Sequence, residues 1–222
     1  MIDVVVDHST TFGAARDQGP RPTCVAFAVS DGHAHHRNLR GQFLSSEYLF
    51  YQAAQRQLPY QHHSGVQTAA VVAALAGDGQ PIETYYPYRS ALHPTAALPV
   101  PSNPFPHPCY KAEWAYEAFS ESLVRDLLEQ GRSILLALRI TDKFFEITPS
   151  QPVLMGDLDN DPVAGIHAVV GVGYGKSRDG TSYVKIRNSW GEQWGNRGYA
   201  WIPMTYADKQ LVWMARLSGN TI

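Results

Sequence analysis

The pattern of apolar and polar positions divides the chain into a helical first part and a β-rich second part. Apolar residues recur at helical spacing over residues 23–39, from residue 45 onward, and over residues 65–77, where alanine is frequent. Residues 1–20 are predicted to be an extended approach that ends in turn-prone sequence. Residues 87–108 are dense in proline and show little periodicity, which favours a fixed crossing loop. A short helix is predicted over residues 120–130.

After Gly131 the pattern becomes typical of strands. Residues 133–140, 167–174 and 181–188 are rich in β-branched and apolar residues, and Arg178-Asp-Gly180 predicts a hairpin turn between the last two strands. One of these strands begins at residue 167 and its neighbour ends at residue 188. The side chains at these two positions are therefore expected at the same end of the hairpin. No internal repeat is visible.

This division predicts two halves that form one functional unit. Residues 1–108 would make a mainly helical domain that ends in the proline-rich strap, and residues 109–222 would make a mainly β domain. The polar residues singled out below are divided between the two halves. A cleft at the junction is therefore the natural place for a site.

Composition excludes several classes of function. The 222 residues carry a net charge of -2 with scattered charges, which gives no reason to expect nucleic acid or an anionic membrane as a partner. Two cysteines cannot build a disulfide framework, so a reducing compartment is expected. The first residues lack a secretory signal, and no stretch approaches the roughly 20 apolar residues of a membrane span. We expect a cytoplasmic protein, with export by a route without a cleaved signal as the alternative.

Cys24 is the residue with the clearest chemical potential. Thr23 is a plausible N-cap, which places Cys24 at the first position of a helix. The positive end of the helix dipole and the free backbone N–H groups there favour a thiolate. The alternative is that Cys24 is a small buried hydrophobic residue, which is the commoner role of a lone cysteine.

Three further residues complete what a cysteine acyl-transfer site requires. His167 would act as base and acid, Asn188 would orient its ring, and Gln18 would donate to the oxyanion. Trp190 would cover the bond between the histidine and the asparagine, with core packing as its alternative role. Taken singly, a histidine is more often structural and an asparagine at a strand end is usually a turn former. Their joint order and spacing favour catalysis.

Metal and cofactor sites are not predicted. Gly171, Gly173 and Gly175 lie inside a hairpin and not between a strand and a helix, so a dinucleotide loop is excluded. The acidic run at residues 157–161 lacks the glycine and the glutamate of a calcium loop. The histidines of residues 33–36 and 62–63 have no completing ligand at a known spacing. Cys109 is most simply a free structural thiol.

Several motifs in order along the chain resemble the papain-like cysteine proteases. The resemblance covers residues 14–203 approximately and is most specific in Asn188-Ser-Trp-Gly-x-x-Trp-Gly195 and in the spacing from Gln18 to Cys24. Further matches are Tyr86-Pro-Tyr88 and the segment around His167. The resemblance implies a papain-like α+β fold, with a helical left domain packed against a β-barrel-like right domain and the cleft between them. It also implies Cys24 as nucleophile, His167 as base and acid, Asn188 as orienter and Gln18 as oxyanion donor.

The resemblance further implies how a substrate would bind. Gly65 would pair its backbone with an extended peptide. The wall of the main apolar subsite would come from residues near Val66, Gln67, Leu136, Ile166 and Ala168. None of these is acidic, so an apolar side chain two residues before the scissile bond is expected. Trp190 is expected beside the substrate as well.

The chain departs from the family pattern in three respects. Arg21-Pro-Thr-Cys24-Val25 stands where the family often has Cys-Gly-Ser-Cys-Trp, so the first cysteine is absent. Its usual partner falls near His62 and is absent too, which resembles bacterial members without disulfides. The family usually carries an N-terminal inhibitory segment, whereas the matched region begins almost at Met1. We therefore expect either a fragment or an activity restrained by a partner, by the chain's own loops or by compartment.

The sequence thus predicts a cysteine peptidase that acts on peptides or proteins through a thioester, without a metal or organic cofactor. One alternative is a transpeptidase or ligase with the same residues, since a triad does not distinguish water from an amine. The others are a non-catalytic peptide-binding module and an effector aimed at one protein target.

Overall fold

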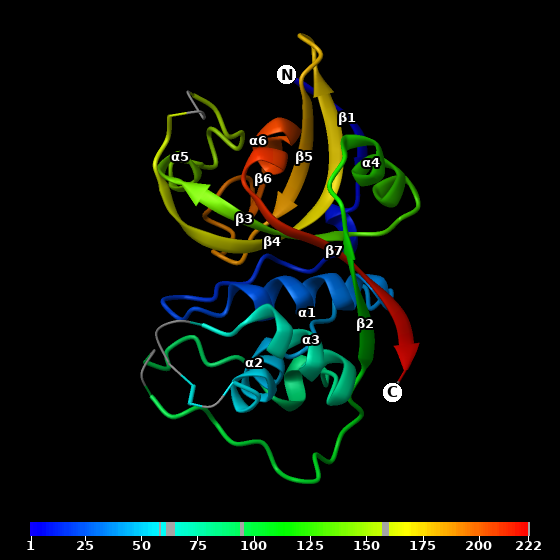
Figure 1. The fold of residues 1–222 in the computed structure, drawn as a ribbon, viewed down its shortest axis with the longest axis vertical. Coiled ribbons are helices and arrows are strands. Elements are labelled where there is room, and N and C mark those ends of the chain that lie inside the picture. The colour runs from blue at the N-terminus through cyan, green and yellow to red at the C-terminus, as the bar shows by residue number, and fades with distance from the viewer. Residues whose placement is uncertain (58, 61–64, 94–95, 157–159, 222) are drawn as a thin grey trace.

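The computed structural model describes residues 1–57, 59–60, 65–93, 96–156 and 160–221. Figure 1 shows a group of helices on one side and a curved antiparallel sheet on the other. The expected histidine pair at residues 62–63 and most of the acidic run at residues 157–161 lie outside the described residues. The elements, in chain order, are β1 Ile2–Asp7, η1 Ser9–Thr11, α1 Cys24–His36, α2 Ser46–Gln55, α3 Thr68–Gly77, η2 Glu83–Tyr85, β2 Lys111–Glu117, α4 Glu121–Glu129, β3 Ile134–Thr141, α5 Asp142–Phe145, β4 Val163–Ser177, β5 Ser182–Arg187, β6 Tyr199–Pro203, α6 Met204–Lys209 and β7 Leu211–Thr221.

Helix α1 is the central helix of the molecule. Residues 26–34 are all buried, because α2 and α3 cover one side of the helix and the sheet covers another (Figure 1). The helix begins at Cys24, as predicted. Thr23 is its N-cap residue, as predicted, but the Thr23 hydroxyl lies 2.9 Å from the Tyr88 hydroxyl and makes no capping bond. The proline-rich residues 87–108 hold neither helix nor strand in their described part, as predicted.

The sheet has the strand order β2-β7-β3-β4-β5-β6, with β1 pairing to the far end of β4, and all these pairings are antiparallel. The three predicted strands correspond to β3, β4 and β5. Strands β1, β2, β6 and β7 did not stand out in the sequence. Gly180, with a φ of 89°, takes the left-handed conformation in the predicted hairpin turn between β4 and β5.

Two apolar clusters hold the fold together. One packs α4, α5 and α6 against strands β3 to β6, and the other joins α1, α2 and α3 to β3, β4 and β7. Strands β3 and β4, in the middle of the sheet, therefore contribute side chains to both clusters. Both Cys24 and Cys109 are free thiols. Among the described residues, no helix combines the length and the apolar character that crossing a bilayer requires.

Candidate active site

Cys24 stands where α1 meets strand β4. Burial raises the pKa of its thiol, and hydrogen bonds from the backbone N–H groups of Ala168, Val25 and Cys24 itself oppose that rise. The N–H donors expected at a helix start are therefore present. These donors favour the thiolate, as predicted, but the loss of hydration on burial outweighs them and the thiol pKa is raised.

His167 lies on β4, directly before the residue whose N–H faces the thiol. Its Nε2 is 2.7 Å from Oδ1 of Asn188, which follows the end of β5. An amide oxygen only accepts hydrogen bonds, so Nε2 carries the proton and Nδ1 keeps its lone pair. Burial lowers the pKa of His167 to about 4, and the hydrogen bond with Asn188 opposes this shift. The ring is therefore a neutral base at rest.

Asn188 is itself held in place. Its Oδ1 also accepts from the backbone N–H of Ser189 at 2.8 Å, and the backbone N–H of Asn188 donates to the carbonyl of Gly198 at 2.9 Å. The side chain is almost completely buried. Trp190 lies over His167, with ring centroids 4.6 Å apart. The indole thus shields the His167–Asn188 pair from water, which is the position that the sequence predicted for it.

Gln18 reaches the same place from the segment before α1. Its Nε2 donates to the Arg21 carbonyl at 2.8 Å, and its Oε1 accepts from the Ser189 hydroxyl at 2.7 Å. The backbone N–H of Gln18 also donates to the Ser189 carbonyl at 2.9 Å. An amide nitrogen has two hydrogens, and one is used by Arg21. The other remains available to a second acceptor.

A groove with a volume of about 630 Å³ begins at Cys24 and runs between α3 and the sheet. No charged side chain lines it among the described residues. Of the residues expected beside a substrate, Gly65, Val66, Gln67, Ile166 and Ala168 line the groove. The complete lining is Pro22, Cys24, Val25, Gln57, Pro59, Gly65, Val66, Gln67, Thr68, Ala137, Ile166, Ala168, Val212 and Trp213.

One residue expected in the wall of this groove lies elsewhere. Leu136 is fully buried in the cluster behind the sheet, and its neighbour Ala137 lines the groove. The reason is strand alternation, because successive side chains of β3 point to opposite faces. Trp190 does not line the groove either; it packs between His167 and Phe145.

Val212 and Trp213, on β7, line the groove but were not anticipated. The indole of Trp213 is fixed by a 3.1 Å hydrogen bond from Nε1 to the Thr68 hydroxyl of α3. Both residues follow the Asn188–Gly195 motif by about twenty positions, with no local chemical signature. Only the pairing of β7 with β3 would have indicated their place beside Ala137, the partner of Trp213 in the sheet.

Gly65 has a φ of 72°, which a side chain would strain, and a Cβ there would meet the Pro22 carbonyl oxygen at 2.9 Å. Only glycine fits this part of the groove wall without movement. No group of three or more histidine, cysteine or acidic side chains suited to a metal occurs in the described part of the chain.

Comparison with known proteins agrees with this geometry. Residues 8–214 match the family model described as papain family cysteine protease. A 33-residue stretch is 64% identical to a cysteine endopeptidase named RepA from Oryza sativa subsp. japonica, covering 15% of this chain and 9% of the relative. A 61-residue stretch is 41% identical to vignain from Vigna mungo, covering 28% of this chain and 16% of the relative. These matches thus span a small part of the curated relatives.

Solved structures resemble the fold over nearly its whole length. Xylellain, a cysteine protease from Xylella fastidiosa, superimposes with a TM-score of 0.79 at 20% identity, covering 98% of this chain and 87% of the other. The clostridial cysteine protease Cwp84 gives a TM-score of 0.75 at 20% identity, covering 95% and 56%. Both are bacterial proteins with the papain-like α+β fold. The family model covers most of the chain, and the chain therefore belongs to the papain family of cysteine proteases.

Proposed function

We propose that this protein hydrolyses peptide bonds through a thioester on Cys24. The observation that carries the proposal is the 2.7 Å contact between His167 Nε2 and Asn188 Oδ1. It fixes the tautomer that leaves Nδ1 as a base, while the thiol lies against the N–H of Ala168, the next residue. With Asn188 as orienter of the base and Gln18 as oxyanion donor, these residues supply the four groups that acyl transfer requires.

The first step joins the thiol to the substrate. The thiol proton passes to His167 Nδ1, and the sulfur attacks the substrate carbonyl. The electron pair of the carbonyl moves to its oxygen. That oxyanion accepts from the backbone N–H of Cys24 and from the second amide hydrogen of Gln18.

The imidazolium then returns the proton. It protonates the leaving nitrogen as the C–N bond breaks, which releases the amine and leaves a thioester on Cys24. A water molecule loses its proton to the neutral His167 and attacks the thioester carbonyl. The second tetrahedral intermediate collapses, the C–S bond breaks, and the sulfur recovers the proton from the ring.

The groove also supports a preference for peptides with an apolar residue two positions before the scissile bond. Its walls include Val66, Ala168 and Trp213, and its polar groups are uncharged. Burying a Leu or Val side chain there gains about 1.5 to 3 kcal/mol, whereas a buried arginine would lack a counter-ion. An extended chain would run past Gly65, where the backbone is uncovered by any side chain.

The test uses fluorogenic dipeptide amides that differ only at this position. We expect kcat/KM for Leu or Val to exceed that for Arg, and we expect no turnover by Cys24→Ala. A substrate-like epoxide should add one adduct to the wild-type protein and none to that variant, as measured by intact mass. An unlabelled Cys24 in folded protein would contradict the proposal. Product analysis with an added amine shows whether water or the amine accepts the acyl group.

A further inference from the structure

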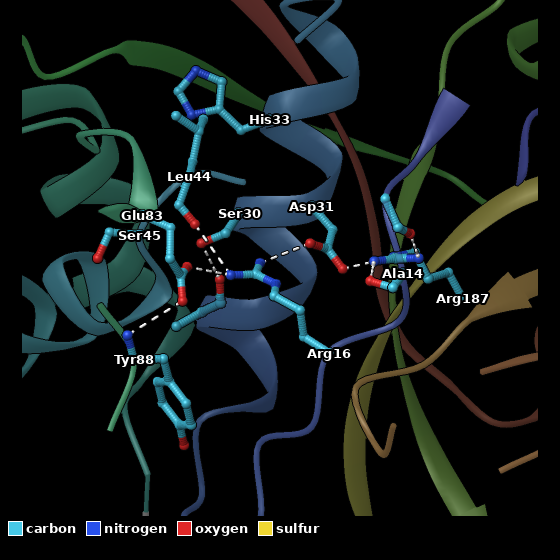
Figure 2. Close-up of polar contacts among 12 residues, drawn as sticks. Ala14, Arg16, Ser30, Asp31, His33, Leu44, Ser45, Glu83, Tyr88 and Arg187 are labelled. Atoms are coloured by element: carbon cyan, nitrogen blue, oxygen red, sulfur yellow. Dashed lines mark hydrogen bonds and ion pairs between the residues drawn. The ribbon is translucent and has the colours of Figure 1, made fainter. Parts of the chain in front are cut away.

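Arg187 is a buried cation that binds groups from three parts of the fold. It is 1% exposed. Nε donates to Oδ2 of Asp31 at 2.7 Å, and Nη1 donates to the Gly13 carbonyl at 2.8 Å and the Tyr199 hydroxyl at 2.6 Å. Nη2 donates to the Ala14 carbonyl at 2.8 Å. Figure 2 shows this guanidinium between the carboxylate and the Ala14 backbone.

Arg187 and two of its partners each lie on a segment that carries one residue of the candidate site. Asp31 lies seven positions after Cys24 on α1, which is about two helical turns. Ala14 begins the short segment that ends at Gln18. Asn188 directly follows Arg187, which is the last residue of β5. One planar group therefore connects the elements that carry the nucleophile, the oxyanion donor and the orienter.

A second arginine extends the connection. Arg16 Nη2 donates to Oδ1 of Asp31 at 2.7 Å, and its Nη1 donates to Glu83 Oε2 at 2.5 Å and to the Leu44 carbonyl at 3.2 Å (Figure 2). The carbonyl of Arg16 accepts from the backbone N–H of Gly191 at 3.0 Å. The segment before α1 is thus held by the helix on one side and by the loop after β5 on the other.

Stability alone gives no reason for such a network at this place. Buried Arg187, partly buried Arg16 and two carboxylates must lose much of their hydration, and well-packed apolar side chains of similar volume often serve stability equally well. The network adds a defined orientation, because a guanidinium group donates hydrogen bonds only in its plane and at fixed angles. Apolar contacts would tolerate small shifts between the three elements.

We propose that Arg187 and Asp31 are positioning residues, which fix the Cys24 helix, the Gln18 segment and Asn188 relative to one another. The inference rests on the proposed function, because it takes those three residues as the reacting groups. A merely structural role would lower the melting temperature and leave the properties of each folded site unchanged. The two roles therefore predict different values of kcat per active site and of the Cys24 alkylation rate.

The experiment compares Arg187→Met and Arg187→Lys with Ile202→Ala, a control that opens a cavity in the core of β6. Two quantities are measured at a temperature where all proteins are folded. The first is kcat and KM for a dipeptide amide, normalised to sites titrated with the epoxide. The second is the rate of Cys24 alkylation by iodoacetamide, which requires no peptide hydrolysis.

For Arg187→Met we expect kcat per site to fall by about 100-fold while KM stays within about twofold, the signature of misplaced reacting groups. Alkylation should slow in parallel, and Arg187→Lys should be intermediate because a point charge satisfies fewer of the four acceptors. Added guanidinium ion should restore part of kcat in Arg187→Ala. The Ile202→Ala control should lose melting temperature only.

Per-site kcat and alkylation rates in the arginine variants equal to those of the control would overturn the proposal. If Arg187→Met fails to fold, Arg187→Lys and Tyr199→Phe carry the same test, since the latter removes the 2.6 Å partner of Arg187 together with a 3.4 Å bond to the Ser9 carbonyl. If the wild type hydrolyses no peptide while the variants still slow alkylation, the proposed function fails and the positioning role stands.

Discussion

The Ser189 hydroxyl donates a 2.7 Å hydrogen bond to Oε1 of Gln18, across the junction between the loop after β5 and the segment before α1. Because this bond holds the amide oxygen, it helps to fix the orientation of the Gln18 amide, whose nitrogen donates to the Arg21 carbonyl. The orientation of Gln18, the proposed oxyanion donor, therefore depends on Ser189, the residue that follows Asn188.

Removing this bond should weaken catalysis modestly, because the Gln18 amide would still be present but free to rotate. For Ser189→Ala we expect kcat to fall about fivefold, the value of one neutral hydrogen bond of about 1 kcal/mol. For Gln18→Ala the loss should be larger, about 100- to 1,000-fold. Steady-state kinetics on a dipeptide amide check both. A serine variant as impaired as the glutamine variant would mean that the hydroxyl acts directly.

Asn188→Ala should change the pH dependence as well as the rate. Burial lowers the pKa of His167 to about 4, and the hydrogen bond with Asn188 opposes this shift. Activity needs the neutral ring, so it is lost as the pH falls through that value. Without the asparagine the acid limb of kcat/KM should move to lower pH, and kcat should fall about 10- to 100-fold. An acid limb that moves upward would contradict this assignment.

A carboxylate in the groove should reverse the expected specificity. Val212 lines the groove and is 40% exposed, so a charge placed there remains hydrated. In Val212→Asp, kcat/KM for a substrate with arginine two positions before the scissile bond should rise about tenfold relative to leucine, which corresponds to a partly screened ion pair. Val212→Asn is the matched uncharged control. An equal change in that control would show that polarity, and not charge, is the cause.

Asp31→Asn should make the stability of the protein less dependent on acid. Burial tends to raise the Asp31 pKa, but the charges of Arg16 and Arg187 outweigh it, so the pKa lies below 3.8. A lowered pKa contributes stability above the unfolded value, and that contribution disappears as the pH falls through the folded pKa. The variant should melt at a lower temperature at pH 7, with about 3 to 5 kcal/mol lost.

The difference in melting temperature between wild type and Asp31→Asn should shrink as the pH is lowered below about 3.8. Thermal unfolding followed by circular dichroism between pH 3 and pH 7 measures it. A difference that stays constant over this range would show that folding does not shift the Asp31 pKa, which would contradict the prediction.

The sequence predicted the candidate site well because its signals are local. Cys24 begins a helix as expected, and strand patterns placed His167 and Asn188 at one end of a hairpin. Leu136 was misplaced by one residue, since an apolar strand buried on both faces gives no alternation from which to assign a face. The burial that raises the Cys24 pKa could not be predicted, because a helix start is visible in a sequence whereas burial depends on the whole fold.

Other features depend on contacts between distant segments. Trp213 enters the groove only through the pairing of β7 with β3. Arg187 and Asp31 are 156 positions apart and looked like two of many scattered charges. Their partnership follows from the packing of α1 on the sheet, which a single sequence does not encode in any one stretch.

The position of Trp213 on the last strand also has a consequence for biosynthesis. Translation proceeds from the N-terminus, so the chain containing Cys24 emerges long before the residues that would activate it. His167, Asn188 and Trp213 are all made after Cys24, and β7 must pair with β3 before the groove has its wall. A nascent chain that has reached only the helices therefore carries the thiol without the proposed base, and the groove is completed only once residue 213 has emerged from the ribosome.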